Sequence, residues 1–372
     1  MTHDLTRPSR RKLLKMTGAA ALATPFLSIR AAAQTTNLSM LAWYGHAEPD
    51  VVGAFEEANN VKFTPKYYTG GDNMLGLIAQ SPPGTYDVIL SDGEYVQQLN
   101  AAGYIEELDP ADYAFDDFFP EFQKFPGHWS DDKLYSVITR FGFLGVAYNT
   151  DAFSEKEAST YGLYADERVT GKLGHFDWHL PNLGQTSLYA GNPSPYDIDA
   201  AAWEAVQEKT MGLRGQVGGF FDYGGTFSSL ESGQMVAFAG IGDWITGVLE
   251  RNGAPVRSVI PEEGGLQWTE SFSIGKGSQN QDMARKWIQY ITSPEGQAVS
   301  ASMAAYPAII PSKAGWQVLN ETNPAEAKRQ NMVLGERNAM DMIREGRIQF
   351  RQLPVQQSLE DWNDFWSDYK GA

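Results

Sequence analysis

The sequence predicts an α/β protein of two domains built on mainly parallel sheets. Its 372 residues exceed one ordinary domain and suit two. Its 10 Trp, 17 Tyr and 19 Phe residues can fill sizeable cores, which argues against disorder. In the first part of the chain, strand patterns alternate with helix patterns of about ten residues, and this alternation is typical of βαβ units.

The first part of the chain shows this alternation most clearly. In residues 49–59, Val51, Val52 and Phe55 share one helical face. Parallel sheets bind ligands at the carboxyl ends of their strands, so residues 43–48 and 91–95 are the first candidates for a site. The predicted strands are 37–43, 61–68 and 86–90, and the predicted helices are 49–59, 72–80 and 94–102.

The middle of the chain is dominated by two long extended runs, at 135–149 and 266–274. The first is either a core strand or a strand that crosses between domains, and the second is a candidate for a second crossing. The pattern between 151 and 200 is irregular. Further strands are predicted at 235–239 and 256–260, and further helices at 200–212, 241–252, 280–292 and 358–369, with another helix starting at Ser293-Pro294.

Composition excludes several functions. The net charge of −17 and the pI of about 4.7 disfavour nucleic acid and anionic membranes as partners. The chain has no cysteine, which excludes disulfides, thiolate metal sites, cysteine nucleophiles and a lipid-modified cysteine. After the N-terminal segment, no run of about 18 apolar residues occurs, so we expect a protein that is not embedded in the membrane.

The N-terminal 33 residues are typical of an export signal. Arg10 and Arg11 lie in a basic block, an apolar stretch from 16 to 29 follows, and Ala31 to Ala33 provide a small-residue cleavage site. This order resembles a twin-arginine signal. We therefore expect cleavage after Ala33 and release into the periplasm.

No catalytic signature accompanies these features. The sequence has no G-x-S-x-G, Walker, G-x-G-x-x-G or H-E-x-x-H motif. His175 and His179 are four residues apart, but Gly174 and Pro181 indicate a loop around them, so no metal is predicted there. We expect a binding protein without enzymatic activity, metal or cofactor. The remote alternatives are an exported hydrolase that uses a carboxylate pair and a structural, partner-binding role.

Five segments, taken in order, resemble the periplasmic spermidine/putrescine-binding proteins of polyamine ABC transporters. They are LAWYGHAEPDVVGAFEE at 41–57, YDVILSDGEYV at 86–96, YSVITRFGFLGVAYN at 135–149, PEEGGLQWTES at 261–271, and YPAI at 306–309. The resemblance implies a type II two-lobe solute-binding fold that closes by bending near 140 and 267. It places lobe one at 34–141 plus 268–314 and lobe two at 142–267 plus 315–372.

The same resemblance assigns a pocket. Trp43 and Trp268 match the family's two ligand-stacking tryptophans, and Glu270 matches its amine-binding aspartate. Tyr306 and Gln352 match a pocket tyrosine and a pocket glutamine.

Other positions depart from the family pattern. His46 replaces a tyrosine, and Asp92 and Glu94 replace a serine and a tyrosine. The family's acidic pair falls near Trp178 and Pro181, where only the neighbouring Asp177 is acidic. A further family tryptophan falls near Gly242, with Asp243 and Trp244 beside it.

Aromatic faces with carboxylates between them favour an ammonium group. We therefore expect a small, amine-containing, polyamine-like solute, delivered by a monomeric receptor to the permease of an ABC importer. Arg140, on the first predicted hinge strand, and Arg351 leave a second reading open. An arginine facing the cleft would favour a zwitterion such as an amino acid derivative or a betaine, unless it pairs with a carboxylate of the protein.

Overall fold

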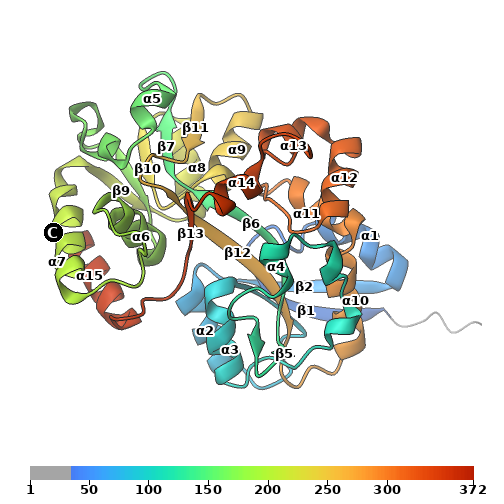
Figure 1. Ribbon diagram of the computed structural model, residues 1–372. Coiled ribbons are helices and arrows are strands. Elements are labelled where there is room, and N and C mark those ends of the chain that lie inside the picture. The colour runs from blue at the N-terminus through green and yellow to red at the C-terminus, as the bar shows by residue number, and fades with distance from the viewer. Residues whose placement is uncertain (1–34) are drawn as a thin grey trace, which may run out of the picture. The chain divides into compact units, whose positions relative to one another are not determined.

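The structure, a computed structural model, describes residues 35–372, which form one compact unit. Two mixed sheets, flanked by helices, dominate it (Figure 1). This confirms the predicted α/β class. The predicted export signal and its cleavage site lie outside the described residues, and the lobe boundaries stay a prediction.

The first sheet has six strands in the order β13-β12-β3-β1-β2, with β6 paired to β12. Strand β1 is parallel to β2 and β3, whereas β12 is antiparallel to β3 and β6. The strands are β1 (Thr36–Ala42), β2 (Val61–Tyr67), β3 (Val88–Asp92), β6 (Val137–Leu144), β12 (Gly265–Ile274) and β13 (Ile348–Phe350).

The helices of the first part follow the predicted alternation. Helix α1 has the predicted bounds, and Val51, Val52 and Phe55 are its buried residues. The elements are α1 (Pro49–Asn59), α2 (Gly71–Ala79), α3 (Val96–Ala101), α4 (Pro120–Gln123), α10 (Gln281–Ile291) and α11 (Pro294–Ser302), together with a short hairpin of β4 (Trp129–Ser130) and β5 (Lys133–Leu134).

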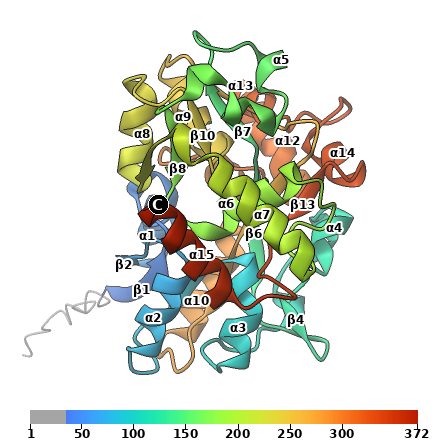
Figure 2. The same cartoon turned by 90° about the vertical axis from the view of Figure 1, so that its left-hand side faces the viewer.

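The second sheet has five strands in the order β11-β7-β10-β8-β9. Its parallel pairs are β10 with β8 and β8 with β9. Helix α15 lies beside α6 and α7 (Figure 2). The strands are β7 (Val146–Asn149), β8 (Leu173–Phe176), β9 (Val217–Phe221), β10 (Ala237–Ala239) and β11 (Val256–Val259); the helices are α5 (Glu155–Ala158), α6 (His179–Tyr189), α7 (Ala200–Gly212), α8 (Tyr223–Glu231), α9 (Asp243–Arg251) and α15 (Leu359–Gly371).

The long run predicted at 135–149 crosses from one sheet to the other. It is interrupted at Gly145, so that β6 belongs to the first sheet and β7 to the second. The other long run is the continuous strand β12, which lies beside β6 in Figure 1. Three more helices follow it in the C-terminal part: α12 (Lys313–Thr322), α13 (Pro324–Arg329) and α14 (Ala339–Arg344).

The expected loop around His175 and His179 is wrong. His175 lies in β8 and His179 is the first residue of α6. Pro181 is tolerated because it lies in the first turn, where backbone amides have no helical partner. His175 Nδ1 lies 2.8 Å from Asn182 Oδ1, so its role in the structure is a hydrogen bond. Within residues 35–372, no group of three or more His, Cys, Asp or Glu residues could hold a metal ion.

None of the helices between residues 35 and 372 is long and apolar enough to cross a membrane.

Candidate functional site

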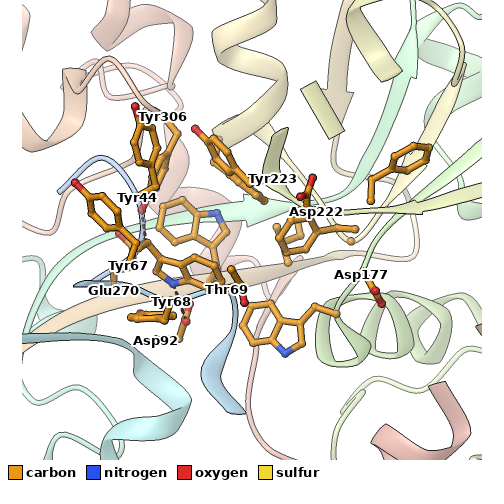
Figure 3. Close-up of a pocket in the computed structure, with 18 of the residues that line it drawn as sticks. Tyr44, Tyr67, Tyr68, Thr69, Asp92, Asp177, Asp222, Tyr223, Glu270 and Tyr306 are labelled. Carbon is orange, nitrogen blue, oxygen red and sulfur yellow. Dashed lines mark hydrogen bonds between the residues drawn. The ribbon is translucent and has the colours of Figure 1, made fainter. Parts of the chain in front are cut away.

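A cavity of about 470 Å³ lies where strands of both sheets end. Residues after β1, β2 and β3 line it from the first sheet, and residues after β8, β9 and β10 line it from the second. Figure 3 shows the labelled side chains converging on this space. The lining residues are Trp43, Tyr44, Tyr67, Tyr68, Thr69, Asp92, Leu144, Phe176, Asp177, Trp178, Phe221, Asp222, Tyr223, Gly240, Trp244, Trp268, Glu270, Tyr306 and Arg351.

Aromatic rings from the two sides touch across the cavity. The Trp43 and Trp178 ring centroids are 6.0 Å apart, and those of Tyr44 and Tyr223 are 5.9 Å apart. The Tyr223 hydroxyl also donates a hydrogen bond of 2.8 Å to the Ala305 carbonyl. These contacts bring the two walls of the cavity together, and the rings offer flat apolar surfaces and π faces to a solute.

Glu270, on β12, is bound by groups of the protein itself. Tyr306 donates a hydrogen bond of 2.6 Å to Oε1, and His46 Nε2 lies 3.0 Å from Oε2. Arg140 Nε lies 3.2 Å from the same Oε2. Burial opposes ionisation, but the His46, Arg140 and Tyr306 groups together hold the pKa of Glu270 below its usual range. Glu270 is therefore an ionised carboxylate whose charge Arg140 already balances.

Arg351 bridges two further carboxylates. Its Nη2 donates to Asp92 Oδ1 at 2.6 Å and its Nε donates to Glu94 Oε1 at 2.5 Å. The other Asp92 oxygen accepts a 3.0 Å hydrogen bond from the Trp43 indole. Burial raises the pKa of Asp92 to about 7 against the opposing charge of Arg351, and burial also raises the pKa of Glu94. Two buried carboxylates thus share one guanidinium.

The second sheet contributes two carboxylates, Asp177 after β8 and Asp222 after β9. Lys370 Nζ lies 2.8 Å from Asp177 Oδ1, and the Trp366 indole donates to the same oxygen. Asp222 caps α8, since its Oδ1 accepts a 2.7 Å hydrogen bond from the Gly225 amide. Among the described residues, Asp222 has no Lys, Arg or His within ion-pair distance.

Eight of the thirteen predicted site residues line this cavity. They are Trp43, Asp92, Asp177, Trp178, Trp244, Trp268, Glu270 and Tyr306.

The other five lie elsewhere. His46, Glu94 and Arg140 are buried behind the lining residues that they contact. Asp243 lines a second cavity of about 340 Å³. Gln352 is exposed and outside the cavity, and its neighbour Arg351 takes its place in the lining.

Two groups of lining residues were missed. Tyr67 ends β2, and Tyr68 and Thr69 follow it, so the strand-end rule that selected residues 43–48 points to this group. The second group, Phe221 to Tyr223, begins at the last residue of β9, whose VGGFF sequence carries two glycines and gives no clear strand signal.

The relatives of this chain are solute-binding proteins. A spermidine/putrescine-binding periplasmic protein of Salmonella typhimurium is 24% identical over 289 residues, which cover 76% of this chain and 80% of the relative. A putrescine/cadaverine-binding protein of Pseudomonas aeruginosa is 23% identical over 278 residues, covering 70% and 76%.

Solved structures agree on the fold. That of a putative spermidine/putrescine ABC transporter protein from Listeria monocytogenes has a TM-score of 0.76 at 19% identity, covering 90% of this chain and 99% of that one. It confirms the predicted two-lobe type of fold. The model of the family described as bacterial extracellular solute-binding protein matches residues 50–321, and the chain therefore belongs to that family.

Proposed function

We propose that this protein is the periplasmic receptor of an ABC importer and that it captures a small, amine-containing solute in the 470 Å³ cavity. The observation that carries the proposal is the cavity itself. Eleven aromatic side chains line it together with four carboxylates from the two sheets. Such a lining attracts an organic cation through ring faces and charge-assisted hydrogen bonds.

Both relatives support an amine as the solute, since each is named as a putrescine-binding protein. The aromatic contacts across the cavity support capture by closure, because the walls meet only when both sides are brought together. In this proposal the closed receptor docks on a membrane permease and releases its solute there.

The zwitterion reading has less support. Arg140 binds Glu270, and Arg351 binds both Asp92 and Glu94. A solute carboxylate would therefore have to compete with carboxylates of the protein for each guanidinium.

The test is to identify what the protein carries. The purified protein is denatured, and the released small molecules are analysed by mass spectrometry. In parallel, a panel of amines, amino acids and betaines is tested for thermal stabilisation, because a ligand at 100 times its Kd adds about 2.7 kcal/mol. We expect an amine in the first experiment and a raised Tm in the second. A folded protein that releases nothing and responds to no member of the panel contradicts the receptor proposal.

A further inference from the structure

The cavity carries its own cations where a solute ammonium would be expected. The Arg351 guanidinium lies 4.4 Å from the centre of the Trp178 ring while it binds Asp92 and Glu94. It is buried, with 3% of its surface exposed. A cation held between an aromatic face and carboxylates is the arrangement that binds ammonium groups. Arg351 therefore fills one such position permanently.

A second internal cation acts in the same way. The Arg140 guanidinium carbon lies 4.5 Å from the Tyr306 ring centre and 5.8 Å from the Trp268 ring centre, beside Glu270. This side chain is fully buried. An ammonium group brought to Glu270 or to Asp92 would approach a guanidinium that already binds that carboxylate, so it would be repelled by this nearby cation and would have to compete with it for the carboxylate oxygens.

One lining carboxylate differs from the other three. Asp92, Asp177 and Glu270 each contact a basic side chain, whereas Asp222 accepts only from the amide of Gly225 within the described part of the chain. It is followed directly by Tyr223, whose ring stacks on Trp244 with centroids 6.0 Å apart. Among the described lining residues, Asp222 is thus the one carboxylate without a basic partner, and it lies next in sequence to one of these rings.

This position lies at the solvent-exposed end of the cavity. Asp222 is exposed, and Tyr44, which contacts Tyr223, is 47% exposed. Trp268 and Trp178, by contrast, are only 5% and 8% exposed. Figure 3 shows Asp222 beside Tyr223, on the side of the cavity away from Asp92. A charged group held at the exposed end keeps part of its hydration, while an apolar group gains most from the buried end.

We infer that the solute carries a single ammonium group, held at Asp222, and a broad apolar body stacked in the buried end, and that Arg351 excludes a second ammonium. The inference rests on the proposed function and narrows its substrate class from amines in general to monoamines. Arg351, the lining cation, already binds Asp92 and Glu94, so a solute carboxylate would have to compete with them and the class disfavours amino acids.

Isothermal titration of the wild-type protein tests the class directly. The probes are three aromatic monoamines (tyramine, phenethylamine and tryptamine), the diamines putrescine and cadaverine, and tyrosine, which differs from tyramine by a carboxylate. We expect the best monoamine to bind at least about tenfold more tightly than either diamine or tyrosine. Tighter binding of a diamine or of tyrosine overturns the inference but leaves the receptor standing. If no probe binds to the folded protein, the monoamine inference fails, while the receptor proposal is judged by the released small molecules and the full panel.

Two variants test the roles assigned to Arg351 and Asp222. Arg351→Met keeps an apolar chain against Trp178 but removes the cation, so putrescine should bind at least about tenfold more tightly than it binds wild type. Arg347→Met, in the second cavity, is the matched control and should leave both the putrescine affinity and the monoamine affinity unchanged. A folded Arg351→Met protein with unchanged putrescine affinity contradicts the exclusion role.

Asp222→Asn keeps the helix cap, because Asn caps as well as Asp, and removes the charge. It should weaken monoamine binding by about tenfold or more with little change in Tm. Asp199→Asn is the control, since Asp199 caps α7 in the same way through the Ala202 amide and lies outside the cavity. Equal monoamine affinity in Asp222→Asn and wild type overturns the placement of the ammonium.

Discussion

Glu270 shows how far a residue's role depends on neighbours that the sequence does not reveal. Its position on a strand of the cleft was predicted, together with the expectation that a solute cation would be its partner. In the structure its partners are Arg140, His46 and Tyr306, which come from three separate parts of the chain. A pairing of this kind depends on side-chain directions, and residue type alone does not give them.

The first prediction concerns this pair. Glu270→Ala leaves the fully buried Arg140 without a counter-charge, so it should lower the free energy of unfolding by about 3–5 kcal/mol. The double variant Glu270→Ala with Arg140→Met removes both charges and should recover much of that loss. Urea unfolding measures both effects.

The control for this series is Glu107→Ala, which breaks an exposed pair with Lys133 and should cost less than about 1 kcal/mol. A double variant that is as unstable as the single one contradicts the assignment of the loss to an uncompensated charge.

The second prediction concerns Asp92 and pH. Its pKa is raised to about 7 in the folded protein, against an ordinary value of 3.8, so between these values the folded state binds a proton that the unfolded state releases. The contribution of Asp92 to the free energy of unfolding is fully present below pH 3.8 and is lost as pH rises through 7. Asp92→Asn cannot titrate, so its stability relative to wild type should rise from pH 4 to pH 7 and then level off.

Unfolding measured at half-unit steps of pH checks this, with Asp199→Asn as a control for the loss of an exposed carboxylate elsewhere. If the difference in the free energy of unfolding between Asp92→Asn and wild type is constant across this pH range, the pKa of Asp92 is not raised.

At the scale of elements, β6 positions the site because one of its glycines allows close contact with the ring of Trp268. A side chain at Gly142 would place its Cβ 2.6 Å from Cζ2 of the Trp268 indole on the neighbouring strand. The glycine therefore lets the ring lie against β6 and face the cavity. Glycine in a strand signals such a contact, but the sequence does not say which ring makes it.

The third prediction follows from this contact. Gly142→Ala should displace the Trp268 ring, lower Tm and weaken binding of the solute identified by mass spectrometry. Gly53→Ala is the matched control, because nothing lies within 4 Å of its Cβ in α1, and it should stabilise the protein by about 0.4–1 kcal/mol. Tryptophan fluorescence and thermal unfolding measure both variants. Unchanged fluorescence and binding in Gly142→Ala would mean that the ring is not held by this contact.

Elements with strong periodicity were predictable, and those with weak patterns were not. Helix α1 agrees with its prediction because its apolar residues recur on one face. Strand β9 was missed because glycines dilute its pattern. Helix α6 was missed because Gly174 and Pro181 indicated a loop, whereas Pro181 lies in the first turn of the helix. In both cases the packing around the element stabilises it more than its own residues do.

For the whole molecule, the parallel βαβ start of the first sheet was readable from the order of strands along the chain, whereas the later pairings were not. The pairing of β6 with β12 joins residues more than 120 positions apart, such as Trp268 with Gly142, and local patterns carry no information about such a pairing. The same limit applies to the cavity. Eight lining residues were assigned. Arg351 was left open as an arginine that could face the cleft, and Asp222 was not assigned.

The start of α9 has a mechanical consequence. Asp243 faces the second cavity, while the adjacent Trp244 faces the first. Phe143 and Leu144 on β6 divide in the same way. Both pairs lie in regular backbone, which moves as a stiff body. A solute that displaces the backbone at Trp244 would therefore also shift Asp243, so the same short stretch of helix connects the two cavities.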